Sequence, residues 1–91
     1  MQENFFVYLI LNIKDNKTIS YVGWTNNLKK RLLLHNSGKG AKFTRGRNWI
    51  LIFKKKMKSK ISAMQFEYKL KKNSKMRKKL INNFIRTTID C

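Results

Sequence analysis

The chain has 91 residues, with 22 lysines and arginines against four acids and a formal net charge of +18 at pH 7. Its length suits one small domain spanning residues 1–91, its apolar runs fall short of the ~20 residues that a membrane span needs, and its one cysteine, Cys91, excludes an internal disulfide or a cysteine-based zinc site. The composition predicts a cytoplasmic protein with a polyanionic partner, because basic side chains near phosphates release counterions.

The amino-terminal part predicts a β-hairpin followed by a helix. Residues 5–13 (FFVYLILNI) and 18–24 (TISYVGW) are rich in strand-forming residues and flank a turn at 14–17 (KDNK). Alternation puts Tyr8 on one face of the first strand and Tyr21 with Gly23 on one face of the second, so both tyrosines share a side if the register allows. Gly23 permits a close approach of the backbone at the strand end. Residues 26–36 have a polar start and a leucine-rich body, which predicts a helix.

The remainder predicts one strand and two further helices. Residues 41–47 (AKFTRGR) form a basic loop, and residues 49–57 (WILIFKKKM) form a third strand. Ser62 and Gln65 have capping-box spacing, at or near the start of a helix that reaches about residue 72. Ser74 is a candidate cap for a last, basic helix at 75–87. The expected fold class is α+β, a small three-stranded antiparallel sheet flanked by helices in the order β-β-α-β-α-α.

Glu67 is the only acid in the middle of the predicted fold, and its helical position is unusual. At about 100° per residue it falls within an apolar arc formed by Ala63, Met64, Phe66, Tyr68 and Leu70. A carboxylate that faces a sheet is costly unless it is paired or binds a cation. Two interpretations remain open, an ion pair with Lys71 one turn later and ligation of Mg²⁺, which often needs only one or two protein carboxylates.

Arg31 and His35 are four residues apart and share one side of the predicted first helix. The guanidinium of Arg31 is always charged and can bind a phosphate through two N–H groups. The alternative interpretation is that Arg31 forms a solvated basic face with Lys29 and Lys30. A histidine in such a position more often caps or packs than catalyses. The two tyrosines are, taken singly, ordinary strand residues, so the interpretation depends on the arrangement of all these groups.

This arrangement resembles the GIY-YIG nuclease superfamily. FVYLI (6–10) is similar to its first motif and YVG (21–23) to its second, with Tyr8 and Tyr21 as the motif tyrosines. Arg31 matches the helix arginine of the family, His35 the histidine one turn further, and Glu67 the metal-binding glutamate of a later helix.

The resemblance covers about residues 5–72 and is strongest to short stand-alone bacterial members related to the nuclease module of excinuclease C, to which HNSGKGAKFTRGR (35–47) is similar. Two departures stand out. Phe6 replaces the first glycine of the first motif, and Trp24 with Thr25 follows the second motif where excinuclease-type members carry a lysine.

The resemblance implies an endonuclease that hydrolyses phosphodiester bonds in DNA, in repair or recombination, with Mg²⁺ or Mn²⁺ as cofactor. Glu67 would hold the metal and Arg31 would neutralise charge developing at the phosphate. Either Tyr8 or Tyr21, assisted by the positive field, the metal or His35, would position or deprotonate the attacking water. The expected phosphate contacts are basic residues outside the motifs, namely Lys39, Lys42, Arg45, Arg47, Lys54, Lys55 and Lys56.

Two other hypotheses compete with this one. A non-catalytic nucleic-acid-binding module on the same fold would need only the basic groove, and a ribosome- or RNA-associated basic protein rests on charge alone. The combination of two tyrosines, an arginine and a buried carboxylate favours the nuclease, because binding alone requires no such carboxylate. We also expect no membrane association, no small-molecule substrate and a monomeric state.

Overall fold

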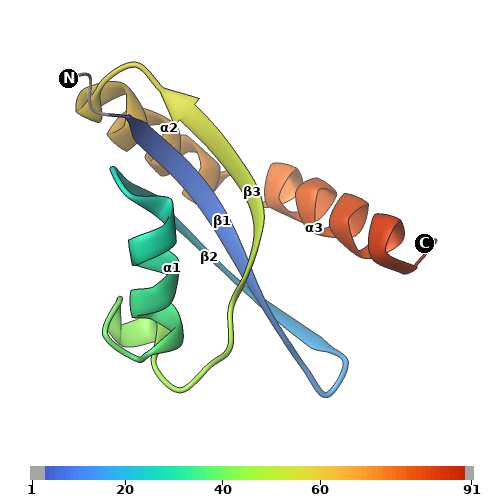
Figure 1. Ribbon diagram of the computed structural model, residues 1–91. Helices are drawn as coiled ribbons and strands as arrows, with labels where there is room; N and C mark the ends of the chain where they lie inside the picture. Colours follow the sequence, from blue (N-terminus) through green and yellow to red (C-terminus); the bar gives the residue numbers. More distant parts are fainter. Residues whose placement is uncertain (1–3, 90–91) are drawn as a thin grey trace.

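The structure, a computed structural model, describes residues 4–89 as one three-stranded antiparallel sheet with helices packed on it (Figure 1). Cys91 lies outside the described residues. The elements confirm the predicted α+β class and the order β-β-α-β-α-α. They are β1 (Phe5–Lys14), β2 (Lys17–Thr25), α1 (Leu28–Asn36), a short 3₁₀ turn η1 (Lys42–Thr44), β3 (Ile50–Met57), α2 (Lys60–Lys72) and α3 (Ser74–Ile89).

The β1–β2 hairpin has a two-residue turn that fixes its register. Asp15 and Asn16 have positive φ angles of 54° and 64°, which the tightest hairpin turns require and which these two residue types tolerate well. The turn therefore has only two residues, where the sequence predicted four at 14–17. In the resulting register Tyr8 lies opposite Gly23 and Ile10 lies opposite Tyr21. Because directly paired residues point to the same face, both tyrosines do share one side of the sheet.

The central strand of the sheet, β1, is buried on both faces, in the sheet order β2-β1-β3. On one face Val7 and Leu9 pack with Ala63 and Leu70 of α2 and with apolar residues of α3. On the other face Tyr8, Ile10 and Trp49 form a second cluster with Leu28 and Leu32 of α1. The sheet thus separates α1 from α2 and α3, so a site with contributions from α1 and α2 has to span an edge strand.

A bulge in the pairing of β3 with β1 determines which face of the sheet each lysine at the end of β3 occupies. Leu9 pairs with Phe53 but Ile10 pairs with Leu51, so one extra residue is accommodated between them. Beyond the bulge, Lys54 lies opposite Tyr8 and therefore on the α1 side of the sheet, as does Lys56 two residues later. Lys55 alternates to the α2 side, where its ammonium lies 4.6 Å from the centroid of the Phe66 ring.

The structure identifies the caps of both carboxy-terminal helices: Ser62 lies early in α2, one of the two positions that the sequence allowed, and Ser74 is the first residue of α3 rather than its cap. Ser59, not Ser62, caps α2, since the Ser59 hydroxyl accepts the N–H of Ser62 at 3.1 Å and the Ser62 hydroxyl accepts the N–H of Ser59 at 3.1 Å. This is a reciprocal capping box one turn earlier than expected. Asn73, not Ser74, caps α3, because its side-chain oxygen accepts the N–H of Met76 at 3.0 Å. Asn73 also ends α2, so a single residue joins the two helices.

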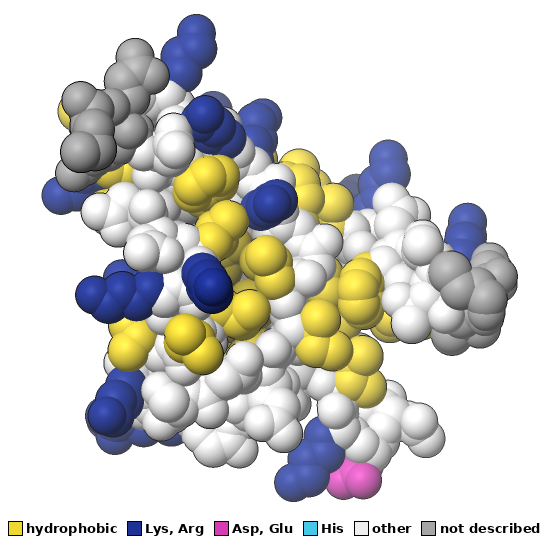
Figure 2. Space-filling model, viewed as in Figure 1, with side chains coloured by type: hydrophobic (Ala, Val, Ile, Leu, Met, Phe, Trp, Pro, Cys, Tyr) yellow, Lys and Arg dark blue, Asp and Glu magenta, His cyan; other side chains and the backbone are white. Residues whose placement is uncertain are grey.

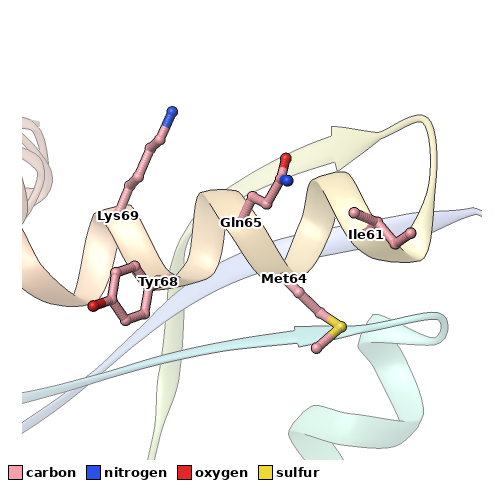
Figure 3. A pocket seen from close by; sticks show the side chains of 5 residues that line it. All are labelled: Ile61, Met64, Gln65, Tyr68 and Lys69. Carbon is pink, nitrogen blue, oxygen red and sulfur yellow. The ribbon is translucent and has the colours of Figure 1, made fainter.

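The apolar arc predicted for α2 is wider than the part of the helix that packs against the sheet. Ala63 and Leu70 are buried and Phe66 packs against the core, as expected for a sheet-facing stripe. Met64 and Tyr68, which the sequence placed in the same arc, remain 48% and 59% exposed and line a shallow pocket on the outer side of the helix (Figure 3). A sheet of three strands is too narrow to cover the whole arc.

The charge predicted from the sequence appears on the surface as scattered lysine and arginine side chains. Figure 2 shows them around a central group of hydrophobic side chains on the face viewed in Figure 1, with hardly any acidic side chain in sight. Among residues 4–89 no helix is long and apolar enough to cross a membrane.

Candidate active site

A groove of about 320 Å³ runs beside the edge strand β2, and all five side chains that the sequence singled out for catalysis line it. The β1–β2 register supplies the two tyrosines, and the four-residue spacing on α1 supplies the arginine and the histidine. The carboxylate comes from α2, on the other side of the sheet, and meets them at this edge. The lining residues are Tyr8, Tyr21, Gly23, Trp24, Arg31, His35, Gly40, Ala41, Glu67 and Lys71.

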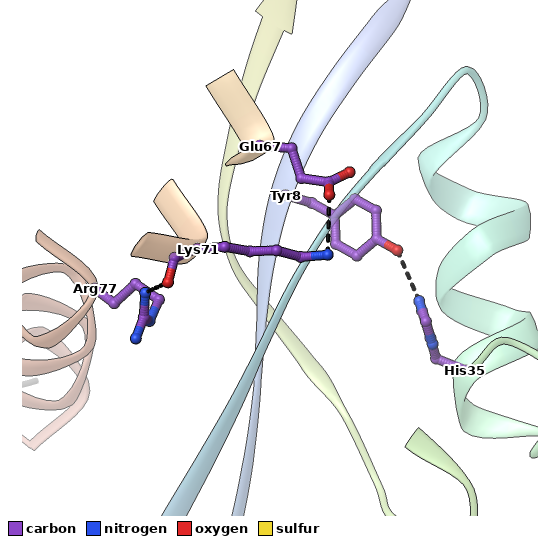
Figure 4. Close-up of polar contacts among 5 residues, drawn as sticks. All are labelled: Tyr8, His35, Glu67, Lys71 and Arg77. Carbon is purple, nitrogen blue, oxygen red and sulfur yellow. Dashed lines mark hydrogen bonds and ion pairs between the residues drawn. The ribbon is translucent and has the colours of Figure 1, made fainter. Parts of the chain in front are cut away.

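Tyr8 and His35 form a buried hydrogen-bonded pair at the base of the groove (Figure 4). The Tyr8 hydroxyl lies 2.7 Å from His35 Nε2, and the two residues are only 4% and 1% exposed. The Tyr21 ring packs edge-on against the same imidazole, with 5.2 Å between ring centroids. His35 therefore touches both tyrosines, and it packs as well as making a polar contact.

The other nitrogen of His35 contacts a residue that the sequence did not single out. Nδ1 lies 2.9 Å from the hydroxyl of Thr44, which is fully buried in the η1 turn. The backbone oxygen of Thr44 in turn accepts a hydrogen bond from Trp49 Nε1 at 3.0 Å. The only hint in the sequence was a lone hydroxyl residue in the glycine-bounded loop that follows the histidine.

Two glycines make room for the Tyr8–His35 pair. A Cβ atom on Gly23 would lie 2.3 Å from the Tyr8 hydroxyl, and a Cβ on Gly40 would lie 2.3 Å from His35 Nδ1. Both distances are far inside van der Waals contact, so any other residue would push these buried rings out of place. The sequence predicted a close backbone approach at Gly23, and the structure specifies that the approaching group is the Tyr8 side chain from the neighbouring strand.

Glu67 forms the ion pair that the sequence offered as one of its two interpretations. Its Oε1 lies 2.9 Å from Lys71 Nζ, and the two side chains are 18% and 48% exposed (Figure 4). The Lys71 ammonium also lies 5.9 Å from the centroid of the Tyr21 ring. A partly exposed pair of this kind contributes little stability, so the contact leaves the second interpretation, metal ligation, open.

The groove fits a hard divalent cation with one protein carboxylate. Within residues 4–89 no three acidic, histidine or cysteine side chains converge on one point. Mg²⁺, however, keeps several waters and is commonly held by one or two carboxylates together with substrate phosphates. Glu67 presents its carboxylate in the groove, and the ammonium of Lys71 shows that a cation can be placed beside it.

Burial and neighbouring charge keep the hydrogen-bonded pair neutral at physiological pH. Burial, the nearby phenol of Tyr21 and the carboxylate of Glu67 raise the pKa of Tyr8, and the Arg31 guanidinium only partly opposes them. Burial, followed by the charge of Arg31, lowers the pKa of His35 below its ordinary value of 6.5. Tyr8 therefore retains its proton, and His35 has one ring nitrogen without a proton.

The lowered pKa of His35 should appear as a pH dependence of stability. Below about pH 6.5 the imidazole of the unfolded chain takes up a proton that the folded protein still excludes, so the free energy of unfolding should fall as the pH falls. Denaturant unfolding at about pH 5 and about pH 7 measures it. His35 is the only histidine, so His35→Gln should remove most of the difference between the two pH values. An equal difference in the variant would contradict this origin.

The predicted phosphate-binding residues do not all lie on one surface. Lys39, Lys42 and Arg45 are exposed around η1, on the His35 side of the molecule. The remaining residue of this loop, Arg47, is half-buried, and its guanidinium lies 5.7 Å from the Phe43 ring centroid. Lys54 and Lys56 share the Tyr8 face, while Lys55 lies on the opposite face. The structure thus separates Lys55 from the other six candidates.

This fold with these side chains is the combination that the sequence led us to expect of a nuclease-type domain, and a comparison with known families supports that class. The family model described as the GIY-YIG catalytic domain matches residues 4–81. The chain belongs to the GIY-YIG family, a nuclease superfamily whose members act on nucleic acid and typically use a divalent metal.

Within that family the chain is similar to short bacterial proteins designated UPF0213. It is 47% identical over 72 residues to UPF0213 protein OB0043 of Oceanobacillus iheyensis, covering 78% of this chain and 80% of that protein. It is 42% identical over 81 residues to UPF0213 protein YazA of Bacillus subtilis, covering 88% and 80%. A solution NMR structure of UPF0213 protein BH0048 from Bacillus halodurans is 40% identical, with coverage of 88% and 83% and a TM-score of 0.47.

Proposed function

We propose that this protein is a metal-dependent endonuclease that hydrolyses phosphodiester bonds in DNA. The observation that carries the proposal is the convergence of Tyr8, Tyr21, Arg31, His35 and Glu67 in one groove, although they come from four separate elements. A binding module would need the surrounding positive charge, but it would gain nothing from a carboxylate held inside that field.

In this proposal the Tyr8 hydroxyl accepts the proton of the attacking water, and His35 accepts the proton that Tyr8 gives up. A phenol with a raised pKa cannot serve as a preformed phenolate at neutral pH. Its hydrogen bond to His35 Nε2 offers another route, in which Tyr8 takes a proton from the attacking water while it passes its own proton to the imidazole. The water oxygen then bonds to phosphorus as the bond to the leaving oxygen breaks, and the leaving oxygen takes up a proton from solvent. The imidazolium, which burial and Arg31 disfavour, returns its proton to solvent.

The remaining groups stabilise charge at the phosphate, position the attacking water and bind the flanking phosphates. Arg31, whose side chain lines the groove, would neutralise the charge that builds up on the phosphate. Glu67 would hold Mg²⁺ or Mn²⁺, and the ion when bound supplies charge stabilisation at the phosphate and the leaving oxygen. Tyr21 packs edge-on against His35, and its proposed role is to orient the attacking water beside Tyr8. Exposed lysines and arginines around η1 and on the Tyr8 face of β3 bind the flanking phosphates.

The proposed setting is DNA repair or recombination in the cytoplasm, with the protein acting as a monomer. All the proposed catalytic side chains come from a single chain, so one copy suffices for the reaction. The family and the basic surface support a nucleic-acid substrate, and DNA is the nucleic acid that the resemblance implies.

A cleavage assay tests this function. End-labelled single-stranded, duplex, nicked and branched DNAs, with an RNA of matched sequence, are incubated with the protein in millimolar Mg²⁺ or Mn²⁺ and in excess chelator. At least one DNA should be cut in the presence of metal and none in chelator. Arg31→Ala, purified in the same way, should not cut, which controls for contaminating nuclease. Tight binding of all substrates without cleavage in either metal would contradict the proposal and favour the non-catalytic binding module.

A further inference from the structure

We propose that Thr44 sets the tautomer of His35, so that Nδ1 carries the ring proton and Nε2 is left as the acceptor that faces Tyr8. Thr44 would thus be a positioning residue that acts through the histidine. The role in cleavage rests on the proposed function, whereas the tautomer itself can be measured without any substrate.

The hydrogen-bond geometry around the Thr44 hydroxyl carries the inference. This hydroxyl has one proton to donate and can accept from two donors. Its Oγ1 lies 2.9 Å from the backbone oxygen of Ala41, which can only accept, so the hydroxyl proton is used there. The N–H of Ala41 donates back to the same oxygen at 3.1 Å. The third contact, 2.9 Å to His35 Nδ1, is then a hydrogen bond only if Nδ1 carries the proton and donates it.

This assignment determines the direction of the bond between His35 and Tyr8. A neutral imidazole protonated at Nδ1 has a bare Nε2, which accepts the Tyr8 hydroxyl proton across 2.7 Å. The proton of Tyr8 then points to His35, and a lone pair of the phenol oxygen remains available on the side of the groove. In the opposite tautomer Nε2–H would donate to Tyr8, and the phenol would have no acceptor for its own proton in the imidazole.

The surroundings keep both the hydroxyl and the ring in place. Thr44 is fully buried, and its backbone oxygen is tied to the indole of the buried Trp49. Gly40 leaves the space that the imidazole fills, because a Cβ there would collide with Nδ1. The ring can neither move away from Thr44 nor exchange its two nitrogens without breaking two buried hydrogen bonds.

Nuclear magnetic resonance of the imidazole nitrogens tests the tautomer directly. His35 is the only histidine, so long-range ¹H–¹⁵N spectra of protein labelled at histidine contain one imidazole. At about pH 7.5, above the ordinary pKa of histidine, the wild type should show a protonated Nδ1 and a bare Nε2. Thr44→Ser should retain this pattern, because it keeps the hydroxyl. Thr44→Val, which keeps the shape but has no hydroxyl, should lose it in favour of the Nε2–H form or a mixture.

Thr25→Val is the matched control. Thr25 is also a buried threonine, at 4% exposure, and its hydroxyl makes a local contact with the N–H of Asn27 at 3.1 Å at the start of α1. Removing this hydroxyl should cost stability but leave the His35 tautomer unchanged. If Thr44→Val does not fold, the wild-type spectrum and Thr44→Ala still decide the assignment. An Nε2–H form in the wild type, or an unchanged tautomer in the folded valine or alanine variant, would overturn the proposal.

Cleavage kinetics test the link to catalysis. Thr44→Val should lower kcat by about tenfold or more with little change in KM, in line with impaired acid–base assistance, and Thr44→Ser should restore most of it. A valine variant with a changed tautomer and an undiminished kcat would overturn the positioning role. If the wild type shows the expected tautomer but cuts no nucleic acid, the tautomer assignment stands and it is the proposed function that fails.

Discussion

Glu67→Gln should lower cleavage by about a thousandfold or more and abolish the response of thermal stability to metal. The magnitude follows from the several kcal/mol of charge stabilisation that a bound ion supplies to the transition state. In the absence of metal the variant should melt close to the wild type, because the ion pair lost with Lys71 is partly exposed and contributes little. Thermal melts with and without millimolar Mg²⁺ or Mn²⁺, alongside the cleavage assay, provide the measurement. A destabilised variant that still cuts in Mg²⁺ would rule out Glu67 as the metal ligand.

Lys71 allows a matched test of the same site. Its ammonium lies beside the carboxylate that the metal would need, so Lys71→Met should lower the Mg²⁺ concentration at which the melting temperature begins to rise. Lys72→Met removes the same charge from the neighbouring position, where the lysine lies 4.6 Å from the centroid of the outward-facing Tyr68 ring. That variant should leave the Mg²⁺ response unchanged. Equal responses of both variants would show that only the net charge matters.

Tyr8→Phe should reduce kcat by about a hundredfold or more, the contribution expected of a lost acid–base group. It keeps the aromatic ring, yet leaves His35 Nε2 buried without its partner, so it should also cost on the order of 1–3 kcal/mol of stability. Tyr21→Phe keeps the edge-on packing against His35 and should be nearly neutral for stability. Single-turnover cleavage and denaturant unfolding of both variants and of the double mutant measure these effects.

The outcome of that comparison assigns the roles of the tyrosines. A large loss in Tyr8→Phe with a smaller loss in Tyr21→Phe supports Tyr8 as the proton acceptor. The reverse order would transfer that role to Tyr21 and contradict the relay through His35. Wild-type rates in both variants and in the double mutant would show that the tyrosines serve only the core.

Features that depend on neighbouring residues were accessible from the sequence. Strand alternation allowed Tyr8 and Tyr21 to share one side of the sheet if the register was right, and the observed register meets that condition. The spacing of Arg31 and His35 placed both on one side of α1, and both line the groove. The sequence placed Ser62 at or near the start of α2 without fixing the cap, because Ser59 and Ser62 are three residues apart and only the backbone geometry shows that Ser59 is the cap and Ser62 lies in the first turn. The bulge in β3 left no signal in the sequence pattern either.

By itself, the sequence determined the order of the elements, the faces of the hairpin and the basic character of the protein, because each follows from composition or from contacts a few residues apart. Only the tertiary structure decided that Tyr8 bonds to His35, 27 residues later. It also decided that Thr44 holds the second nitrogen and that Gly23 and Gly40 leave space for the two rings. The contacts of Thr44 and Gly40 depend on how the loop between α1 and β3 returns to the sheet, and the bond between Tyr8 and His35 depends on how α1 packs on the sheet. No local preference of the chain fixes either arrangement.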